Sequence, residues 1–333
     1  MKDFKNYSLK EHNTFGIDAK CSRFLEFENG DEAVEVAGIL RASNNPYIII
    51  GSGSNLLLTR DFEGIVVHSA IKGIEQQADL VRCGSGEVWD DVVAWSIGQG
   101  LFGAENLSLI PGDVGASAVQ NIGAYGAEVK DLITQVEAVE IATGRLCTFT
   151  NEDCQYGYRD SRFKHDWKNR YLVLRVTYQL SDEFRPKLDY GNIRAELERK
   201  GIAEPTAWQL RQTIIDIRRE KLPDPDVTGN AGSFFMNPVV SREKYESLAA
   251  QYAGMPHYTI DADHEKIPAG WLIDQCGWKG RALGRAGVHS RQALVLVNLG
   301  GATGSEIVTL CEQIRHDVRE RFGIDIHPEV NIV

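Results

Sequence analysis

A short glycine-rich segment, Gly51-Ser-Gly-Ser-Asn55, constrains the fold more than any other part of the sequence. It directly follows residues 46–50, whose consecutive apolar side chains predict a buried strand. A Rossmann dinucleotide site would need a third glycine at position 56 followed by a helix, but residue 56 is leucine and another strand is predicted soon after it. The segment is therefore either a tight turn or a phosphate-binding loop of a different fold, in which successive N–H groups bind an anion.

A second segment, residues 110–126, consists mostly of glycines and small side chains and begins Ile110-Pro-Gly-Asp-Val-Gly115. If a helix begins here, its first N–H groups and the positive end of its dipole are available to a phosphate. The small residues 116–118 leave room for a bulky cofactor, although close packing of a helix on a sheet favours the same composition. Two such loops in one chain make a shared dinucleotide-type ligand a reasonable expectation.

The remaining pattern predicts an α+β chain with several sheets. At 333 residues the chain is longer than one hydrophobic core usually supports, so two or three domains are expected. The run Leu222-Pro-Asp-Pro225 ends a predicted helix and is the best candidate for a domain boundary. Predicted helices are 31–40, 88–97, 206–221, one from Ser241 and 305–322, and predicted strands are 46–50, 65–68, 80–83, 136–141, 171–180, 293–297 and a returning tail at 323–333.

Composition excludes several classes of function. The six cysteines and eight histidines are scattered without ligand spacing, which favours reduced thiols over disulfides and argues against a metal site. A net charge of −11 argues against nucleic acid or an anionic membrane as partner. No apolar run is long enough for a signal peptide or a membrane span, so a cytoplasmic protein is expected.

An ordered set of motifs spreads over nearly the whole chain. Besides the two glycine-rich segments it includes Asn13-Thr-Phe-Gly16, Tyr156-Gly-Tyr-Arg-Asp-Ser161, Lys221-Leu-Pro-Asp-Pro225, Gly229-Asn-Ala-Gly-Ser-Phe-Phe235, Asn237-Pro238, Ala269–Ile273, Gln292–Asn298 and His327-Pro-Glu-Val330. Together these motifs resemble the UDP-N-acetylenolpyruvoylglucosamine reductase (MurB) family of bacterial cell-wall synthesis. The segment Lys187-Leu-Asp-Tyr190 resembles the longer of the family's two types, in which a tyrosine closes over the nucleotide sugar.

The resemblance implies FAD bound in a two-subdomain fold of the vanillyl-alcohol-oxidase type, with NADPH as electron donor and a separate substrate domain. The expected division is residues 1–68 with 326–333 returning, residues 69–222, and a substrate-binding domain at 223–325. The expected ligand is a UDP-sugar, and no obligate protein partner is implied. One departure from the family pattern is Met236, where a basic residue is expected.

The reaction implied is a two-stage reduction of an enolpyruvyl ether. Hydride passes from flavin N5 to the terminal alkene carbon, charge spreads as an enolate onto the carboxylate, and the adjacent carbon takes a proton. The resemblance assigns Arg159 to grip the carboxylate, Ser233 to donate the proton as a buried hydroxyl, and Glu329 to hold or orient a proton. From the residues alone, a surface arginine, a capping or turn serine and an exposed edge-strand glutamate are the ordinary alternatives.

Binding residues follow from the same resemblance. Arg218 is expected near the flavin N1–O2 edge, and Lys221 near the substrate diphosphate, whereas Arg211 and Arg219 are assigned to a solvated helix face. The predicted cofactor-binding residues are Gly51, Ser52, Gly53, Ser54, Asn55, Leu56, Ile110, Pro111, Gly112, Gly115, Ala116, Ser117, Gln120, Asn121, Gly123 and Arg218, and the predicted substrate-binding residues are Tyr158, Tyr190, Lys221, Asn237 and Gln292.

Three alternative functions remain open at this point. A flavin oxidase of the same fold would act on a hydroxy acid or alcohol, and a non-catalytic descendant would bind a nucleotide sugar without flavin. A nicotinamide-dependent Rossmann dehydrogenase is disfavoured by Leu56.

Overall fold

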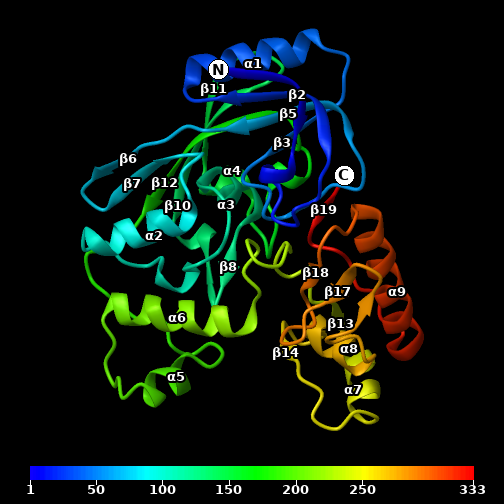
Figure 1. The fold of residues 1–333 in the computed structure, drawn as a ribbon. Helices are drawn as coiled ribbons and strands as arrows, with labels where there is room; N and C mark the ends of the chain where they lie inside the picture. The colour runs from blue at the N-terminus through cyan, green and yellow to red at the C-terminus, as the bar shows by residue number, and fades with distance from the viewer. The chain divides into compact units, whose positions relative to one another are not determined.

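The computed structural model describes residues 1–333, and the chain forms two compact units (Figure 1). Unit 1 contains residues 1–7, 21–52 and 63–219, and unit 2 contains residues 8–20, 53–62 and 220–333. Each unit combines helices with small sheets, so the chain is α+β. This division differs from the expected one, because two early segments group with the C-terminal residues while most of 1–68 groups with 69–219.

Unit 1 contains two larger sheets besides the short β8–β9 hairpin. The first has the order β1-β2-β5-β3, and its β3 and β5 run parallel. The second has the order β11-β10-β12-β7-β6 with antiparallel neighbours throughout. The strands are β1 (Lys2–Ser8), β2 (Lys20–Phe27), β3 (Tyr47–Ile50), β5 (Phe62–Ser69), β6 (Ile74–Gln77), β7 (Leu80–Gly84), β10 (Ile133–Glu140), β11 (Leu146–Thr150) and β12 (Tyr171–Gln179).

Helix α1 (Gly30–Ala42) packs its apolar face into a core that includes strands of both sheets. Its first turn is capped by Asn29, whose side chain accepts a hydrogen bond from the Glu32 N–H at 3.0 Å. The buried side chains Val36 and Leu40 of the helix share this core with Ile65 of β5 and Leu172 of β12. The two sheets are thus held together by one hydrophobic cluster.

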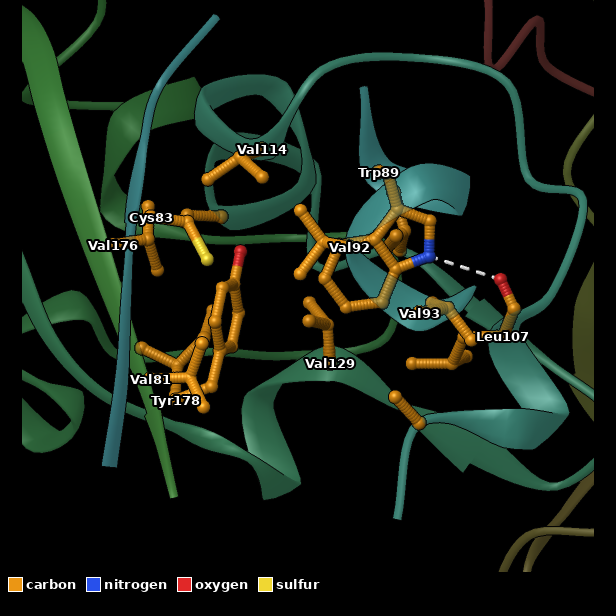
Figure 2. Packing of buried hydrophobic residues seen from close by; sticks show 14 of the residues in the cluster. Val81, Cys83, Trp89, Val92, Val93, Leu107, Val114, Val129, Val176 and Tyr178 are labelled. Carbon is orange, nitrogen blue, oxygen red and sulfur yellow. Dashed lines mark hydrogen bonds between the residues drawn. The ribbon is translucent and has the colours of Figure 1, made fainter. Parts of the chain in front are cut away.

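A larger core lies around Trp89 and Tyr178, whose rings meet edge to face at 5.4 Å (Figure 2). The Trp89 indole N–H donates to the carbonyl of Leu107 at 2.9 Å, as the dashed line in Figure 2 shows. The Tyr178 hydroxyl lies 3.0 Å from Ser117 Oγ. These two buried contacts anchor Leu107, just before the second glycine-rich segment, and Ser117 within it.

The other elements of unit 1 connect these sheets and cores. Helix α6 begins with a capping box, in which the Gln209 N–H donates to Thr206 Oγ1 at 3.2 Å and Gln209 Oε1 accepts the Thr206 N–H at 2.9 Å. These elements are α2 (Trp89–Gly98), η2 (Glu105–Leu107), α3 (Val114–Gln120), β8 (Gly123–Ala124), β9 (Ala127–Glu128), η3 (Val129–Asp131), α4 (Asn151–Cys154), η4 (Arg162–Lys164), α5 (Ile193–Arg199) and α6 (Ala207–Lys221).

Unit 2 is built from short strands and the long helix α9 (Gly304–Phe322), which begins with a Thr303–Glu306 capping box and ends at Gly323, φ +60°. The parallel pair β4 (Leu56–Leu57) and β19 (Asn331–Ile332) joins the early loop to the C-terminal tail. The other elements are η1 (Lys10–His12), β13 (Val239–Ser241), α7 (Arg242–Ala249), β14 (Tyr258–Thr259), β15 (His264–Lys266), α8 (Ala269–Gln275), β16 (Ala282–Leu283), β17 (Ala286–Val288) and β18 (Leu296–Asn298).

Most predicted elements are confirmed, and two are shorter than expected. The predicted strand 293–297 is present only as β18 (Leu296–Asn298), and the predicted tail strand is confined to β19. The tail does return to an early strand, as expected. No helix has the length and apolar character needed to cross a bilayer.

Candidate active site

The two glycine-rich segments meet in unit 1. A Cβ atom on Gly51 would lie 3.0 Å from Asp113 Oδ2 and 3.2 Å from the Ala116 Cβ, so the end of β3 rests against the start of α3. The Ser52 hydroxyl next to this contact is buried without a hydrogen-bond partner. An unmatched buried hydroxyl is costly, and a phosphate oxygen or cofactor hydroxyl would satisfy it.

The rest of the first segment belongs to unit 2. Gly53 has φ +73°, and a Cβ atom there would lie 1.9 Å from the carbonyl oxygen of His12. The Gly53 carbonyl accepts the Thr14 N–H at 3.3 Å, while the Asn55 carbonyl accepts the Asn331 N–H at 3.1 Å. The shape of residues 53–56, including Ser54 and buried Leu56, is therefore set by residues 12–14 and by the C-terminal strand.

Helix α3 does not offer the free N–H groups that the sequence suggested. The Val114 N–H donates to Glu87 O at 2.9 Å, and the Gly115 N–H donates to Ser85 O at 2.8 Å. A Cβ atom on Gly115 would lie 2.9 Å from the Ser85 Cβ. The expectation of free donors at these two positions is wrong, because the loop at 85–87 already uses them.

Two predicted cofactor contacts have side chains that are fully used inside the protein. Ser117 Oγ donates to Val114 O at 2.7 Å, and the buried amide of Asn121 donates to Glu128 Oε2 and to Gly157 O, each at 2.6 Å. Their side chains serve the fold, so any contact of theirs with a cofactor must use the backbone. The other predicted residues here, Ile110, Pro111, Gly112, Ala116, Gln120 and Gly123, lie before α3, within it, or in β8.

Arg159 is not a surface arginine. It is half-buried with φ +55°, and its Nη2 donates to the carbonyl of Gly123 at 2.7 Å. Its own carbonyl accepts from Lys164 Nζ at 2.9 Å. A non-glycine residue in the left-handed region is held there by its surroundings, so the guanidinium has a defined direction beside the β8–β9 hairpin.

Arg218 of α6 lies in the same region of unit 1. Its Nε is buried without a hydrogen-bond partner. Burial lowers the pKa of Arg218, the charge of Arg159 lowers it further, and Tyr125 and Asp90 act in the opposite direction. A half-buried guanidinium that is exposed to the charge of a second cation favours an anionic ligand, and Arg218 therefore fits the anionic edge of a reduced flavin.

Arg211, which the sequence analysis assigned to a solvated face, is only 8% exposed. Its Nη1 and Nη2 donate to the two oxygens of Asp90 at 2.6 and 2.8 Å. The assignment was wrong because the partner carboxylate lies on α2, far away in the sequence.

Tyr190 lies over the β8–β9 hairpin, with its ring 6.5 Å from the Tyr125 ring in an edge-to-face contact. Asn106, which no sequence motif indicated, connects the hairpin to the segment that carries Tyr190. Its Nδ2 donates to the carbonyls of Tyr125 and Lys187 at 2.8 and 3.0 Å. Tyr190 is 46% exposed, so much of its surface remains available to a ligand.

Ser233 and Glu329 are brought together by the backbone of unit 2. The Glu329 N–H donates to Phe234 O at 2.8 Å, and the Met236 N–H donates to His327 O at 2.9 Å. Glu329 is half-buried and lies just before β19. Ser233 is exposed rather than buried as expected, because this segment leaves the fold between Gly232 and the buried Phe234.

The predicted substrate residues of unit 2 have partly structural roles. Asn237 Oδ1 accepts the Ala269 N–H at 2.9 Å at the start of α8. Gln292 Oε1 accepts the Leu294 N–H at 3.3 Å, and each of these side chains keeps its NH₂ group for further contacts. Lys221 is the last residue of α6, and Tyr158 in unit 1 is 48% exposed.

The residues present fit an FAD cofactor. Ser52 Oγ and Arg218 Nε are buried polar atoms without protein partners, and they lie in the unit where the two glycine-rich segments meet. Arg159 belongs to that unit, whereas Ser233 and Glu329 belong to unit 2. No group of three or more His, Cys, Asp or Glu residues is arranged to hold a metal ion.

Two family models match the chain. One is described as an FAD binding domain and matches residues 22–150. The other is the C-terminal domain of UDP-N-acetylenolpyruvoylglucosamine reductase and matches residues 224–333. These matches confirm the expected combination of an FAD-binding part with a distinct C-terminal domain.

Curated relatives cover the chain from end to end. A UDP-N-acetylenolpyruvoylglucosamine reductase from Bacteroides fragilis is 54% identical over 335 residues, covering 99% of each chain. One from Pseudomonas aeruginosa is 48% identical over 330 residues, covering 98% of this chain and 97% of the relative. The solved structure of the reductase from Thermus caldophilus has a TM-score of 0.69 at 23% identity and covers 99% of this chain and 98% of its own, which shows a shared fold.

Proposed function

The chain belongs to the UDP-N-acetylenolpyruvoylglucosamine reductase family, and from this premise we propose that Ser233, Glu329 and Arg159 carry its reaction, with NADPH as the electron donor. The reaction is the FAD-dependent reduction of UDP-N-acetylglucosamine enolpyruvate, a step in peptidoglycan precursor synthesis. The observation that carries the residue assignment is the backbone bond from Glu329 to Phe234, which holds Ser233 and Glu329 in one part of unit 2.

Ser233 is proposed as the proton donor. When bound and reduced, FAD would supply hydride chemistry at the terminal alkene carbon, and the adjacent carbon would then have to take a proton. A serine is a weak acid in bulk water, and the exposed Ser233 hydroxyl can act only once the substrate has covered it. Glu329, whose backbone N–H is bonded to the carbonyl of the neighbouring Phe234, is proposed to orient that hydroxyl or to pass it a proton.

Arg159 is proposed to stabilise the charge that spreads onto the substrate carboxylate. A guanidinium can grip a carboxylate with two parallel hydrogen bonds, and it acts best where its direction is fixed beforehand. The bond of Nη2 to Gly123 O and the left-handed backbone of Arg159 supply that fixed direction.

FAD would be held mainly by the two glycine-rich segments and by Arg218. In unit 1 the backbone around Gly51 and the unpartnered Ser52 hydroxyl would bind the phosphates, and Arg218 would lie at the anionic edge of the flavin ring. The UDP-sugar would contact Tyr190 and Tyr158 in unit 1 and Lys221, Asn237 and Gln292 in unit 2. Tyr158 and Tyr190 are 48% and 46% exposed, and the bonds of Asn237 and Gln292 described above use only Oδ1 and Oε1.

The decisive experiment is NADPH oxidation by purified, yellow protein with and without the enolpyruvyl UDP-sugar. The proposal expects rapid turnover only when the substrate is present, together with its conversion to UDP-N-acetylmuramate. Reoxidation by oxygen without any UDP-sugar would favour an oxidase, and colourless protein that still binds UDP would favour a non-catalytic binder. NADH run in parallel tests the choice of donor.

A cytoplasmic location belongs to the same proposal. All six cysteines are free, and burial raises the pKa of Cys21, Cys154 and Cys276 to about 11. Thiols that are neutral and mostly buried are typical of proteins that work in a reducing compartment.

A further inference from the structure

Asp90 on α2 connects two parts of the cofactor region in unit 1. Its Oδ1 accepts the backbone N–H of Leu109 at 2.5 Å, and both of its oxygens accept from Arg211 on α6. Leu109 has φ +57° and immediately precedes Ile110 and Pro111 of the predicted cofactor loop. The Asp90 carboxylate therefore holds a strained residue at the entrance of that loop.

Arg211 and Arg218 lie on the same face of α6, because residues seven apart in a helix are separated by almost two full turns. Asp90 acts on both of them: its charge raises the pKa of Arg218, and Arg218 and Arg211 each lower the pKa of Asp90. Yet only Arg211 forms the two hydrogen bonds with Asp90, and Arg218 Nε stays unpartnered.

We propose that Arg211 is a positioning residue for the cofactor: by occupying both oxygens of Asp90 it steadies Leu109 and prevents Asp90 from pairing with Arg218. The proposal rests on the contact between Arg218 and the flavin put forward above. Without Arg211, a half-buried carboxylate would lose its partner and turn to the remaining cation nearby, because an unpaired charge in such surroundings is costly. The flavin edge would then lose its guanidinium.

The test compares R211Q with the double variant R211Q/D90N. Apoprotein is reconstituted with FAD to measure the dissociation constant by flavin fluorescence, and the midpoint potential of the bound flavin is measured by dye equilibration. R211Q is expected to bind FAD about tenfold more weakly, which corresponds to about 1.4 kcal/mol, and to shift the potential to more negative values, because a cation at the flavin edge favours the reduced, anionic form.

The double variant separates positioning from simple packing. Removing the charge of Asp90 leaves nothing to capture Arg218, so R211Q/D90N is expected to return the potential to the wild-type value. The asparagine oxygen can still accept the Leu109 N–H. R219Q, which changes an exposed neighbouring arginine of the same helix, is the matched control and is expected to behave like the wild type.

The proposal is overturned if R211Q keeps the wild-type potential, or if R211Q/D90N is as negative as R211Q. R218Q, measured together with R211Q and R211Q/D90N, tests the proposed contact between Arg218 and the flavin. If R218Q leaves both FAD affinity and potential unchanged, the flavin contact itself fails, whereas an effect of R218Q without one of R211Q rejects only the role of Arg211. Should R211Q lose its flavin, R211K is measured in its place. A smaller negative shift of the potential from the wild-type value is then expected, because an ammonium still pairs with the Asp90 charge but cannot hold both of its oxygens. A wild-type potential in R211K would overturn the proposal.

Discussion

The backbone N–H of Glu329 donates a 2.8 Å hydrogen bond to the carbonyl of Phe234, the residue that follows Ser233. Phe235 and Pro328 face each other in an isolated bridge at the same place. This link uses only backbone atoms. Substitution of the Ser233 or the Glu329 side chain therefore leaves the segments around residues 233 and 329 together. Variants at Ser233 and Glu329 therefore report on chemistry rather than on the position of the chain.

Ser233→Ala is expected to leave reduction of FAD by NADPH nearly intact and to slow oxidation of the reduced flavin by substrate about 10²- to 10⁴-fold, since a proton donor is lost. Stopped-flow absorbance of the flavin measures each half-reaction separately. Ser247→Ala, at an exposed serine of α7, is the control. Equal losses in both half-reactions would count against the role of Ser233.

Glu329→Gln removes the negative charge of the carboxylate and its ability to take up and release a proton, but keeps the size of the side chain. We expect the reaction of reduced flavin with substrate to slow about 10²-fold, with FAD affinity unchanged. Glu320→Gln, an exposed glutamate of α9, should have no effect. A Glu329→Gln enzyme with wild-type single-turnover rates would show that the carboxylate takes no part in proton transfer.

Arg159→Ala is expected to retain FAD and to lower the single-turnover rate with substrate about 10²- to 10³-fold, as for loss of a group that stabilises developing charge. Arg159→Lys should recover only part of that loss, because an ammonium cannot make the paired contact. Flavin content per chain and single-turnover kinetics are the two measurements. A colourless Arg159→Ala protein would assign this residue to the cofactor instead.

His68 should make the stability of unit 1 depend on pH. Its Nδ1 lies 2.9 Å from Glu26 Oε2, and its Nε2 lies 3.6 Å from Asp113 Oδ2. Burial lowers the pKa of His68, but Asp113 and Glu26 outweigh it, so the pKa is raised above its ordinary value of 6.5. The stabilisation is therefore full below pH 6.5 and is lost as the pH rises through the folded-state pKa.

Urea unfolding of wild type and His68→Asn at several pH values between about 5.5 and 8.5 measures this effect. The difference in unfolding free energy between the two proteins should shrink as pH rises, because only the wild type loses a charged contact. A difference that stays constant over this range would exclude His68 as the titrating group.

Gly53→Ala is expected to destabilise unit 2 by more than about 3 kcal/mol, because φ +73° is unfavourable for alanine and the new Cβ would collide with the His12 carbonyl. Gly254→Ala has a similar φ of +76° but meets nothing within 4 Å. It should lower the stability by only about 1 to 2 kcal/mol, which is the cost of the left-handed backbone conformation for alanine without any clash. Thermal unfolding of both variants measures the difference. Equal losses of stability in the two variants would show that the contact with His12 adds nothing to the cost of the backbone conformation.

Local sequence signals predicted much of this fold. The helices predicted at 206–221, from Ser241 and at 305–322 are present as α6, α7 and α9, and local caps at Thr206, Ser241 and Gly323 lie at their ends. The leucine at position 56 argued against a Rossmann dinucleotide site and left a tight turn or a phosphate-binding loop of another fold. These features depend on residues that are near one another in the chain, so they can be recognised without the structure.

What could not be predicted depends on distant partners. Nothing near Arg211 in the sequence distinguishes it from Arg218 or Arg219, and only the contact with Asp90 on α2 does so. The N–H groups of α3 were expected to be available, but residues 85–87 use two of them. The exposure of Ser233 likewise depends on how its neighbours Phe234 and Phe235 are buried.

Unit 2 is assembled from three separated stretches of chain, residues 8–20, 53–62 and 220–333. On the ribosome the first two emerge well before the third, since residues 63–219 are made in between, and at typical elongation rates the interval is on the order of ten seconds. Phe15 and Leu57, completely buried in the finished protein, must wait through that interval without their later-made partners. Newly made chains should therefore need protection from aggregation, such as chaperone binding to these early segments, until the C-terminal stretch arrives.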